Sequence, residues 1–274
     1  MAIVVNAIQG VGTWVQGTSY LGYDNLFLQA GVVVAANDED VGFPGSNATS
    51  WLTAGGGWQT TGVGDKILTA TLLSAADIDS YGVYKHNLGT LGLTVKLQYS
   101  TDGAAWTDLP GSEKTPADDS AIYFVAAAVV SAKFFRLHVV GVLAGETLII
   151  GNAFVSKSLR VWSPPETGWV PPNLALDNTY LNNRSEGGDF MGRTVIRKGS
   201  KTNFNISVAS DDWIRSDWFP FMEAAEAHPF YHAWDTVAHA SEVAFCYTDG
   251  KIETPKYVNS RYMSFGIKFF ALID

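Results

Sequence analysis

The sequence has little cysteine and little charge, and each shortage excludes a class of protein. Cys246 is the one cysteine among 274 residues, so the chain can form neither an internal disulfide nor a cysteine-rich metal site. Charged residues make up 16% of the chain, whereas a quarter is usual. Hydrophobic residues reach 47% and aromatic residues 13%, which argues against disorder and against a coiled coil. We therefore expect a folded chain that is stabilised by burial alone.

The sequence also lacks an excess of basic residues. It has 18 Lys and Arg against 27 Asp and Glu, which gives a net charge of −9. An acidic chain gains nothing from the counterion release that drives binding to DNA and RNA. We expect no nucleic-acid partner.

No membrane-targeting or membrane-spanning segment is evident. The amino terminus has neither a basic n-region nor a cleavage motif, which predicts that the chain is made and stays intact in a cytoplasm. The most apolar long stretch, residues 121–145, contains Lys133, Arg136 and His138 near its middle, and each central cation would cost about 2.5 to 3.5 kcal/mol in a bilayer. We predict no membrane partner.

A cluster of prolines predicts where the chain divides. Four of the ten prolines, Pro164, Pro165, Pro171 and Pro172, fall within residues 163–173. Paired prolines favour extended backbone and remove hydrogen-bond donors. We interpret residues 163–173 as a semi-rigid linker between a first domain at 31–162 and a second at 174–274.

Alternating hydrophobicity dominates the first domain. Residues 93–99 are apolar at odd and polar at even positions, which is typical of a strand with one face on a core. Residues 101–103 predict a tight turn, and Phe135, Leu137 and Val139 alternate in the same way. Short strands separated by glycine-rich loops, without a long amphipathic helix, indicate an antiparallel β-sandwich or jelly roll.

The second domain has a mixed pattern. Residues 203–208 alternate as a strand, and Ser210 is a candidate helix N-cap before two acidic residues. Apolar residues then recur at helical spacing up to Ala225, interrupted by Pro220, which predicts a kink or two short helices. Strand patterns return after Pro229. This part of the chain predicts a smaller α+β domain with one helix on a sheet or barrel.

The sequence offers no catalytic motif. It contains no Gly-x-Ser-x-Gly, no His-Glu-x-x-His and no phosphate-binding Gly-Lys-Ser/Thr loop. His228, His232 and His239 form a loose trio that we weighed as a metal site and interpret as polar strand positions. Residues 38–40 form an acidic loop for which we weighed a structural calcium ion and favour a solvated turn. We predict no enzyme activity, no metal and no cofactor.

Aromatic residues in loop-like segments are the candidate contacts to a ligand or partner, because exposed rings stack on sugars or anchor interfaces. The candidate contact residues are Phe43, Trp51, Trp58, Tyr20 and Tyr23, with Trp14 in a similar segment. The alternative is that most of these rings close the ends of the sandwich. Four further aromatic residues are predicted to be structural core, namely Trp106, Phe135, Trp213 and Trp218.

Four segments of the first domain resemble a known jelly roll. These segments are residues 43–47 with Trp51, residues 84–88, residues 97–103 with Trp106, and residues 134–137. Over residues 30–160 the pattern is similar to the discoidin type of carbohydrate-binding-like β-sandwich. The resemblance implies that glycan or lipid ligands bind in the loops at one end.

A longer set of segments resembles tail-tip and baseplate proteins of tailed bacteriophages. The set comprises residues 149–157, 185–199, 213–221, 228–234, 243–249 and 263–269. The resemblance implies a structural virion protein in the viral tail, made in the host cytoplasm. Its partners would be neighbouring tail proteins, host surface glycan, and other copies of itself in a ring of three or six. Residues 1–30 would then be an N-terminal arm that reaches a neighbouring subunit.

Three functions therefore remain open at the level of the sequence. The first is the phage tail-tip or baseplate protein, with a jelly roll that faces outward and contacts host glycan. The second is a carbohydrate-binding module without catalytic activity. The third is a polysaccharide-cleaving enzyme, for which the sequence nominates no pair of carboxylates.

Overall fold

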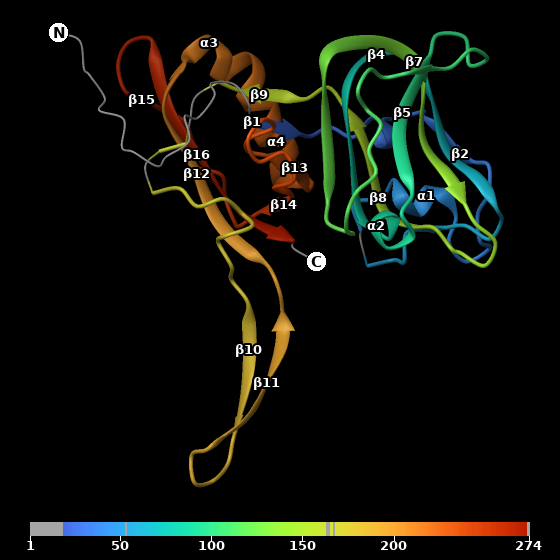
Figure 1. The fold of residues 1–274 in the computed structure, drawn as a ribbon. Coiled ribbons are helices and arrows are strands. Elements are labelled where there is room, and N and C mark those ends of the chain that lie inside the picture. The colour runs from blue at the N-terminus through green and yellow to red at the C-terminus, as the bar shows by residue number, and fades with distance from the viewer. Residues whose placement is uncertain (1–18, 53, 163–164, 167, 273–274) are drawn as a thin grey trace.

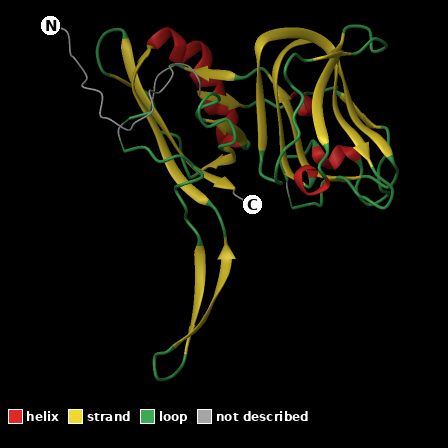
Figure 2. Cartoon of the chain, viewed as in Figure 1, coloured by secondary structure: helices red, strands yellow, loops and turns green. Residues whose placement is uncertain are grey.

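The chain folds into two sheet-based bodies that lie side by side. The computed structural model describes residues 19–52, 54–162, 165–166 and 168–272. Strands dominate both bodies, and helices are short except on one face of the second body (Figure 2). Each body contains a seven-stranded sheet and a hydrophobic core. The mainly β fold class predicted from the alternating patterns is confirmed.

The first body is the jelly roll, with strands in the order β3-β8-β4-β7-β5-β6 and β2 paired to β4. Its strands are β2 (Val33–Ala36), β3 (Trp58–Gln59), β4 (Gly64–His86), β5 (Thr94–Ser100), β6 (Thr107–Asp108), β7 (Ile122–Val142) and β8 (Ile149–Ser156). Its short helices are η1 (Leu26–Leu28), α1 (Gly45–Ala48) and α2 (Leu88–Leu91). Val95 and Leu97 of β5 are buried as their alternation predicts. They pair with Val139 and Leu137 of β7, and all four residues belong to the first core.

Two strands of the jelly roll are much longer than the short strands predicted. β4 spans 23 residues and β7 spans 21. The two pair along their lengths, with register shifts between Thr71 and Ala76 and between Ile78 and Ser80. Such irregularities bend a pair and increase its twist. The bent pair can therefore run continuously around the sandwich, as the curved β4 and β7 in Figure 1 show.

The second body is the α+β domain, with strand order β12-β16-β14-β13-β1-β9 and β15 paired to β16. Its strands are β1 (Ser19–Gly22), β9 (Leu159–Val161), β12 (Ser200–Ser210), β13 (Phe230–Ala233), β14 (Val243–Thr248), β15 (Lys256–Tyr257) and β16 (Tyr262–Leu272). One helical layer covers a face of this sheet, formed by α3 (Asp211–Trp213), the π-helical turn η2 (Ile214–Trp218) and α4 (Phe219–Ala227). The predicted arrangement of one helix on a small sheet is confirmed.

The helical layer begins and bends where the sequence indicates. The Ser210 side chain accepts a hydrogen bond from the backbone N–H of Trp213 at 3.3 Å, so Ser210 is the predicted N-cap. The layer widens into the π-helical turn immediately before Pro220, which lies in the first turn of α4. Because proline has no N–H to donate to the preceding turn, regular α-helical hydrogen bonding is interrupted here. The predicted kink is therefore present as a π-helical turn.

The boundary between the two bodies is not where the prolines predicted it. β1 pairs with both β13 and β9, so residues 19–22 belong to the second sheet and not to an arm at 1–30. The jelly roll is therefore inserted into the second domain between β1 and β9. Residues 159–161 belong to the second sheet too, which corrects the predicted first domain of 31–162. Residues 1–18 lie outside the described part of the chain.

The described residues of the proline-rich stretch also pack on the second domain. The backbone N–H of Glu166 donates to the carbonyl of Asn205, and the hydroxyl of Thr202 donates to the carbonyl of Val170. Both partners lie on β12. The prolines therefore stiffen a segment that lies along an edge strand of the second sheet. The chain passes between the two bodies elsewhere, once after β1 and once before β9.

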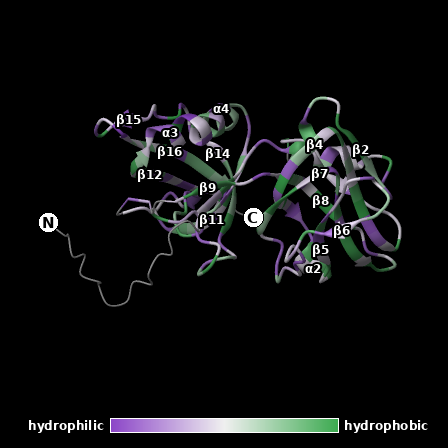
Figure 3. Ribbon diagram, turned by 90° about the horizontal axis from the view of Figure 1, so that it is seen from above, coloured by the Kyte–Doolittle hydropathy of each residue, from purple (hydrophilic) through white to green (hydrophobic). Residues whose placement is uncertain are grey.

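An aromatic cluster joins the two bodies. Tyr84, Tyr123 and Phe154 of the jelly roll pack on Tyr231 and Phe245 of the second sheet. The Tyr84 and Phe245 rings are stacked, with centroids 4.8 Å apart. Figures 1 and 3 show the two bodies side by side from two directions.

A two-stranded hairpin leaves the second body and extends away from it. Its strands are β10 (Thr179–Arg184) and β11 (Phe190–Arg197), which pair with each other and with no other strand in the described ranges. Figure 1 shows it reaching well beyond the sheet that carries it.

No helix in the described part of the chain is long and apolar enough to cross a membrane. The apolar stretch at 121–145 forms β7 and the turn that follows it.

Candidate functional site

The predicted contact residues do not come together in one place, and Trp58 is not a surface residue. Its side chain is fully buried, and its indole Nε1 donates to the carbonyl of Asp38 at 2.8 Å. At the neighbouring Gly57 a Cβ would lie 2.2 Å from the carbonyl oxygen of Ile150. The glycine-rich loop therefore passes close against β8 and carries the ring inward. The prediction of an exposed contact at Trp58 is wrong.

The other four predicted contact residues are half-buried and lie apart. Tyr20 is in β1, and the guanidinium of Arg160 lies over its ring. Tyr23 packs edge-on against Phe221 of the helical layer, with centroids 5.5 Å apart. Phe43 is also half-buried, and its ring lies against Gly56. Trp14 lies outside the described residues.

Trp51 lines a cleft between the two bodies. Its ring is stacked on that of His228, with centroids 5.5 Å apart and an angle of 14° between the planes. The cleft has a volume of about 520 Å³, and α1 and the loop after it supply hydroxyl groups from Ser46, Thr49 and Ser50. The Oγ of Thr49 donates to the carbonyl of Ser46. A ring beside hydroxyl groups makes this cleft one candidate site for a small polar ligand.

The four residues predicted as core fall into two groups. Phe135 and Trp218 are fully buried in the first and second cores. Trp213 is half-buried and packs on Phe265 and Trp218 at the edge of the second core. Trp106 is half-buried on the outside of the jelly roll, above the guanidinium of Arg136, whose central carbon lies 4.2 Å from the ring centroid. The prediction that Trp106 belongs to the core is therefore wrong.

The turn between β5 and β6 determines where Trp106 lies. The Ser100 hydroxyl accepts from the backbone N–H of Gly103, and the carboxylate of Asp102 accepts from the N–H groups of Ala104 and Ala105. These backbone hydrogen bonds, that of Ala104 first, hold the pKa of Asp102 below its usual value. Gly103 has a φ of 77°, which favours glycine. The turn ends by laying the indole on the sheet surface and not between the sheets.

Beneath and beside Trp106, polar side chains of three strands form a connected network. Arg136 of β7 donates from Nε to Oε1 of Gln98 on β5 at 2.6 Å, and Gln98 donates from Nε2 to Asp108 of β6. Lys96 donates from Nζ to the other oxygen of Asp108 at 2.9 Å. The strand register places these residues side by side, because Gln98 pairs with both Arg136 and Asp108.

The electrostatics of this network keep it charged and fixed. The hydrogen bond from Lys96, and then that from Gln98, lowers the pKa of Asp108. Burial lowers the pKa of Arg136, which still leaves an arginine protonated near neutral pH. Within the described chain, Arg136 forms one hydrogen bond, which it donates from Nε. Both Nη groups therefore remain as donors for a ligand. We call Trp106, Arg136, Gln98, Asp108 and Lys96 the Trp106 platform.

Sequence reasoning missed this platform for a physical reason. Alternation alone assigns the even positions of β5 and β7 to the solvated faces of strands, and the pairing of β5 with β7 and β6 is not visible in one sequence. One sequence feature does point to the platform. The turn at 101–103 reverses the chain, so that Trp106 comes back beside β5.

Each acidic residue considered as a metal ligand in the loop at 38–40 has another partner. Within the acidic loop, Asp38 forms an ion pair with Lys66, Glu39 accepts from the backbone N–H of Gly45, and Asp40 accepts from that of Gly42. His232 is fully buried, and burial lowers its pKa to about 3. Among the described residues, three or more His, Cys, Asp or Glu side chains do not gather in any arrangement that could hold a metal ion.

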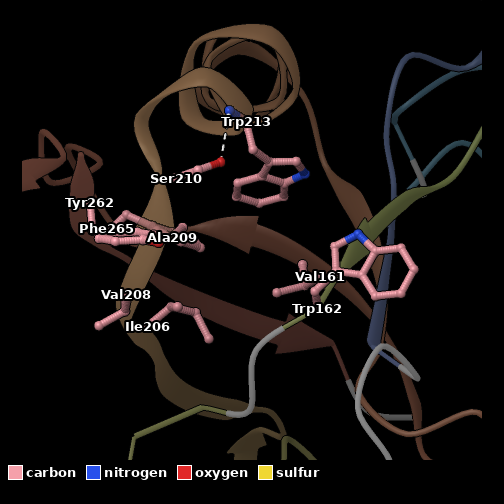
Figure 4. A pocket seen from close by; sticks show the side chains of 9 residues that line it. All are labelled: Val161, Trp162, Ile206, Val208, Ala209, Ser210, Trp213, Tyr262 and Phe265. Carbon is pink, nitrogen blue, oxygen red and sulfur yellow. Dashed lines mark hydrogen bonds between the residues drawn. The ribbon is translucent and has the colours of Figure 1, made fainter.

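An apolar groove opens on the second body (Figure 4). It has a volume of about 260 Å³. Residues of β9, β12, α3 and β16, with Trp162, line it (Figure 4). Trp162 is 50% exposed and Val208 is 48% exposed. This groove holds no titratable cluster, and it is a surface for apolar groups.

Comparisons with known proteins find structural similarity over about half of the chain. A pectin-binding carbohydrate-binding module has 18% identity and a TM-score of 0.39, and the match covers 49% of this chain and 92% of the module. The module CBM32-5 of Clostridium perfringens, solved with GalNAc-β-1,3-galactose, has 15% identity and a TM-score of 0.39 over 46% of this chain and 95% of the module.

Some similar structures are larger enzymes. A Ruminococcus gnavus GH29 fucosidase solved with fucose has 18% identity and a TM-score of 0.40, and the match covers 49% of this chain and 27% of the fucosidase. No family model and no curated protein matches the chain. Similarities at this level do not decide what the chain binds. The predicted resemblance to phage tail-tip and baseplate proteins finds no support in these comparisons.

Proposed function

We propose that this chain is a non-catalytic carbohydrate-binding protein that holds a sugar unit on the Trp106 platform. The observation that carries the proposal is the half-exposed indole of Trp106 lying above Arg136, with the side chains of Gln98, Asp108 and Lys96 joined beside it. Sugars present an apolar C–H face and a rim of hydroxyl groups. An aromatic ring next to fixed hydrogen-bonding side chains matches both.

The platform is organised before a ligand arrives. Each polar side chain is already held by its neighbour, so little side-chain freedom remains to be lost on binding. The Nη groups of Arg136 can donate to two hydroxyl groups, and the carboxylate of Asp108 can accept from a third. The two cations, Arg136 and Lys96, lie beside the carboxylates of Asp108 and Asp65, which favours neutral sugars over strongly acidic ones.

Binding of the full chain to a glycan array, followed by calorimetry with the best sugar, tests the proposal. We expect Trp106→Ala and Arg136→Met to lower the affinity at least about tenfold, a loss of about 1.4 kcal/mol. Arg136→Met keeps an apolar side chain of similar length beneath the ring and removes the donors.

The cleft at Trp51 supplies the matched control. Trp51→Ala removes a half-buried tryptophan of the same body, and we expect it to leave sugar affinity unchanged. If Trp51→Ala abolishes binding and Trp106→Ala does not, the sugar site lies in the cleft and the platform assignment is wrong. If no glycan binds, the proposed function fails.

Two other hypotheses from the sequence have their own tests. A role in a phage tail requires the chain to be present in purified virions, and labelling of the particle for electron microscopy would locate it there. A polysaccharide-cleaving activity requires products to appear when the chain is incubated with host capsule or lipopolysaccharide. Neither hypothesis is needed for the platform to bind a sugar.

A further inference from the structure

The β10–β11 hairpin is exposed along almost its whole length. Every residue of β10 is exposed, and so is every residue of β11 except Gly192. Its apolar side chains include Leu181, Phe190, Met191 and Ile196, each more than half exposed. A two-stranded hairpin is at best marginally stable in water by itself. An apolar, isolated hairpin of this kind is typical of a segment that is covered by another molecule.

The charge of the hairpin is opposite to that of the chain that carries it. Its strands contain Arg184, Arg193 and Arg197 and no carboxylate, and residues 177–199 have four basic and three acidic side chains, a net charge of +1. The rest of the chain then has a net charge of −10, since the whole is −9. The surface that fits the hairpin is therefore acidic, with apolar groups inside it.

The second body offers such a surface at the helical layer. Residues 211–227 contain five acidic side chains and Arg215, a net charge of −4. The apolar groove opens directly beside the start of this layer, where Ser210 and Trp213 line it (Figure 4). Asp211 and Asp212 follow the cap in the first helical turn. Its volume of about 260 Å³ suits one large apolar side chain.

We propose that the hairpin of one copy docks on the helical layer of a second copy, with an apolar side chain of the hairpin in the groove and Arg184 facing Asp211 and Asp212. The hairpin points away from its own body (Figure 1), so it reaches this acidic surface only on another copy. The contact joins two different surfaces, so repeating it builds a closed ring or an open filament. This self-assembly is independent of sugar binding at the Trp106 platform.

Sedimentation of the full chain over a range of concentrations tests the proposal. The wild-type chain is expected to self-associate, and the charge reversal Arg184→Glu is expected to weaken association at least about tenfold because it faces acidic groups. Adding Asp212→Arg to that variant should recover much of the loss. Phe190→Ser tests the apolar part, and both Arg184 and Phe190 are exposed, so folding should be retained.

Lys251→Glu is the matched control, because it reverses one exposed charge of the same body outside the hairpin and the helical layer. It should leave association unchanged. A wild-type chain that stays monomeric at high concentration overturns the proposal. Self-association that survives both Arg184→Glu and Phe190→Ser also overturns it, since the interface then lies elsewhere.

Discussion

The hydroxyl of Tyr231 donates a hydrogen bond to Oδ1 of Asn152 at 2.9 Å, and this bond joins the second sheet to the inserted jelly roll. Both side chains are fully buried. Asn152 in turn donates from Nδ2 to the carbonyl of Ser50. Burial raises the pKa of the Tyr231 hydroxyl, so it stays a neutral donor. The two bodies are therefore held by a specific polar contact inside an aromatic cluster.

Tyr231→Phe should lower the free energy of unfolding by about 1 to 3 kcal/mol, because it leaves the buried Asn152 oxygen without its partner. Chemical denaturation measures the change. Tyr262→Phe removes a hydroxyl from a ring that is 43% exposed and should change stability by no more than about 0.5 kcal/mol. Equal losses in the two variants would mean that the bond does not stabilise the junction.

Gly82→Ala should destabilise the chain by about 1 to 3 kcal/mol through overpacking. A Cβ at Gly82 would lie 2.7 Å from the Tyr231 ring, so the two bodies would have to separate slightly. Gly55→Ala is the control, because nothing lies within 4 Å of a Cβ there. Thermal unfolding of both variants measures the difference in stability. If Gly82→Ala were as stable as Gly55→Ala, the Tyr231 ring could not lie as close to Gly82 as the structure shows.

Trp58→Ala should cost about 3 to 5 kcal/mol of stability, because it empties a fully buried site. Trp106→Ala should cost less than about 2 kcal/mol, since it removes a half-buried ring and its contact with the Arg136 guanidinium. Denaturation of the two variants under one set of conditions ranks them. If Trp106→Ala cost more stability than Trp58→Ala, Trp106 would have to be a core residue.

Asp38→Asn should destabilise the jelly roll by about 3 to 5 kcal/mol, because it leaves the ammonium group of Lys66 buried without its counter-charge. Lys66 is 2% exposed and pairs with Asp38. The double variant Asp38→Asn with Lys66→Met should recover most of this loss. The denaturation curves of the wild-type chain, Asp38→Asn, Lys66→Met and the double variant together form a double-mutant cycle. A double variant no more stable than Asp38→Asn would show that the charge is not the cause.

His232 should make the second domain less stable in acid. Burial lowers its folded pKa to about 3, while an unfolded histidine titrates near 6.5. Between these values the unfolded chain binds a proton that the folded chain does not, so stability present above pH 6.5 is lost as the pH falls toward 3.

The effect is measured as the slope of unfolding free energy against pH between about 6.5 and 4.5, above the range where most carboxylates titrate. In His232→Phe this slope should be smaller by up to about 1.4 kcal/mol per pH unit. His239→Gln, which changes an exposed histidine, should keep the wild-type slope. An unchanged slope in His232→Phe would mean that the buried ring is already protonated.

Local chemistry in the sequence determined the elements that depend on near neighbours. Alternation placed Val95, Leu97 and Phe135 on the core face of their strands, and a hydroxyl followed by two acidic residues placed the helix start at Ser210. These features follow from the period of a strand and from the unpaired N–H groups of a first helical turn.

The tertiary structure alone decided which tryptophan is buried, where the chain changes body, and which polar residues meet. Trp58 and Trp106 both follow loops rich in small residues, yet long-range packing on β8 buries one and the pairing of β5 with β7 exposes the other. The strand β1 finds its partners β9 and β13 more than a hundred residues away. Such contacts depend on the whole fold, because burial of a side chain is set by the elements that reach it and not by its own neighbours in sequence.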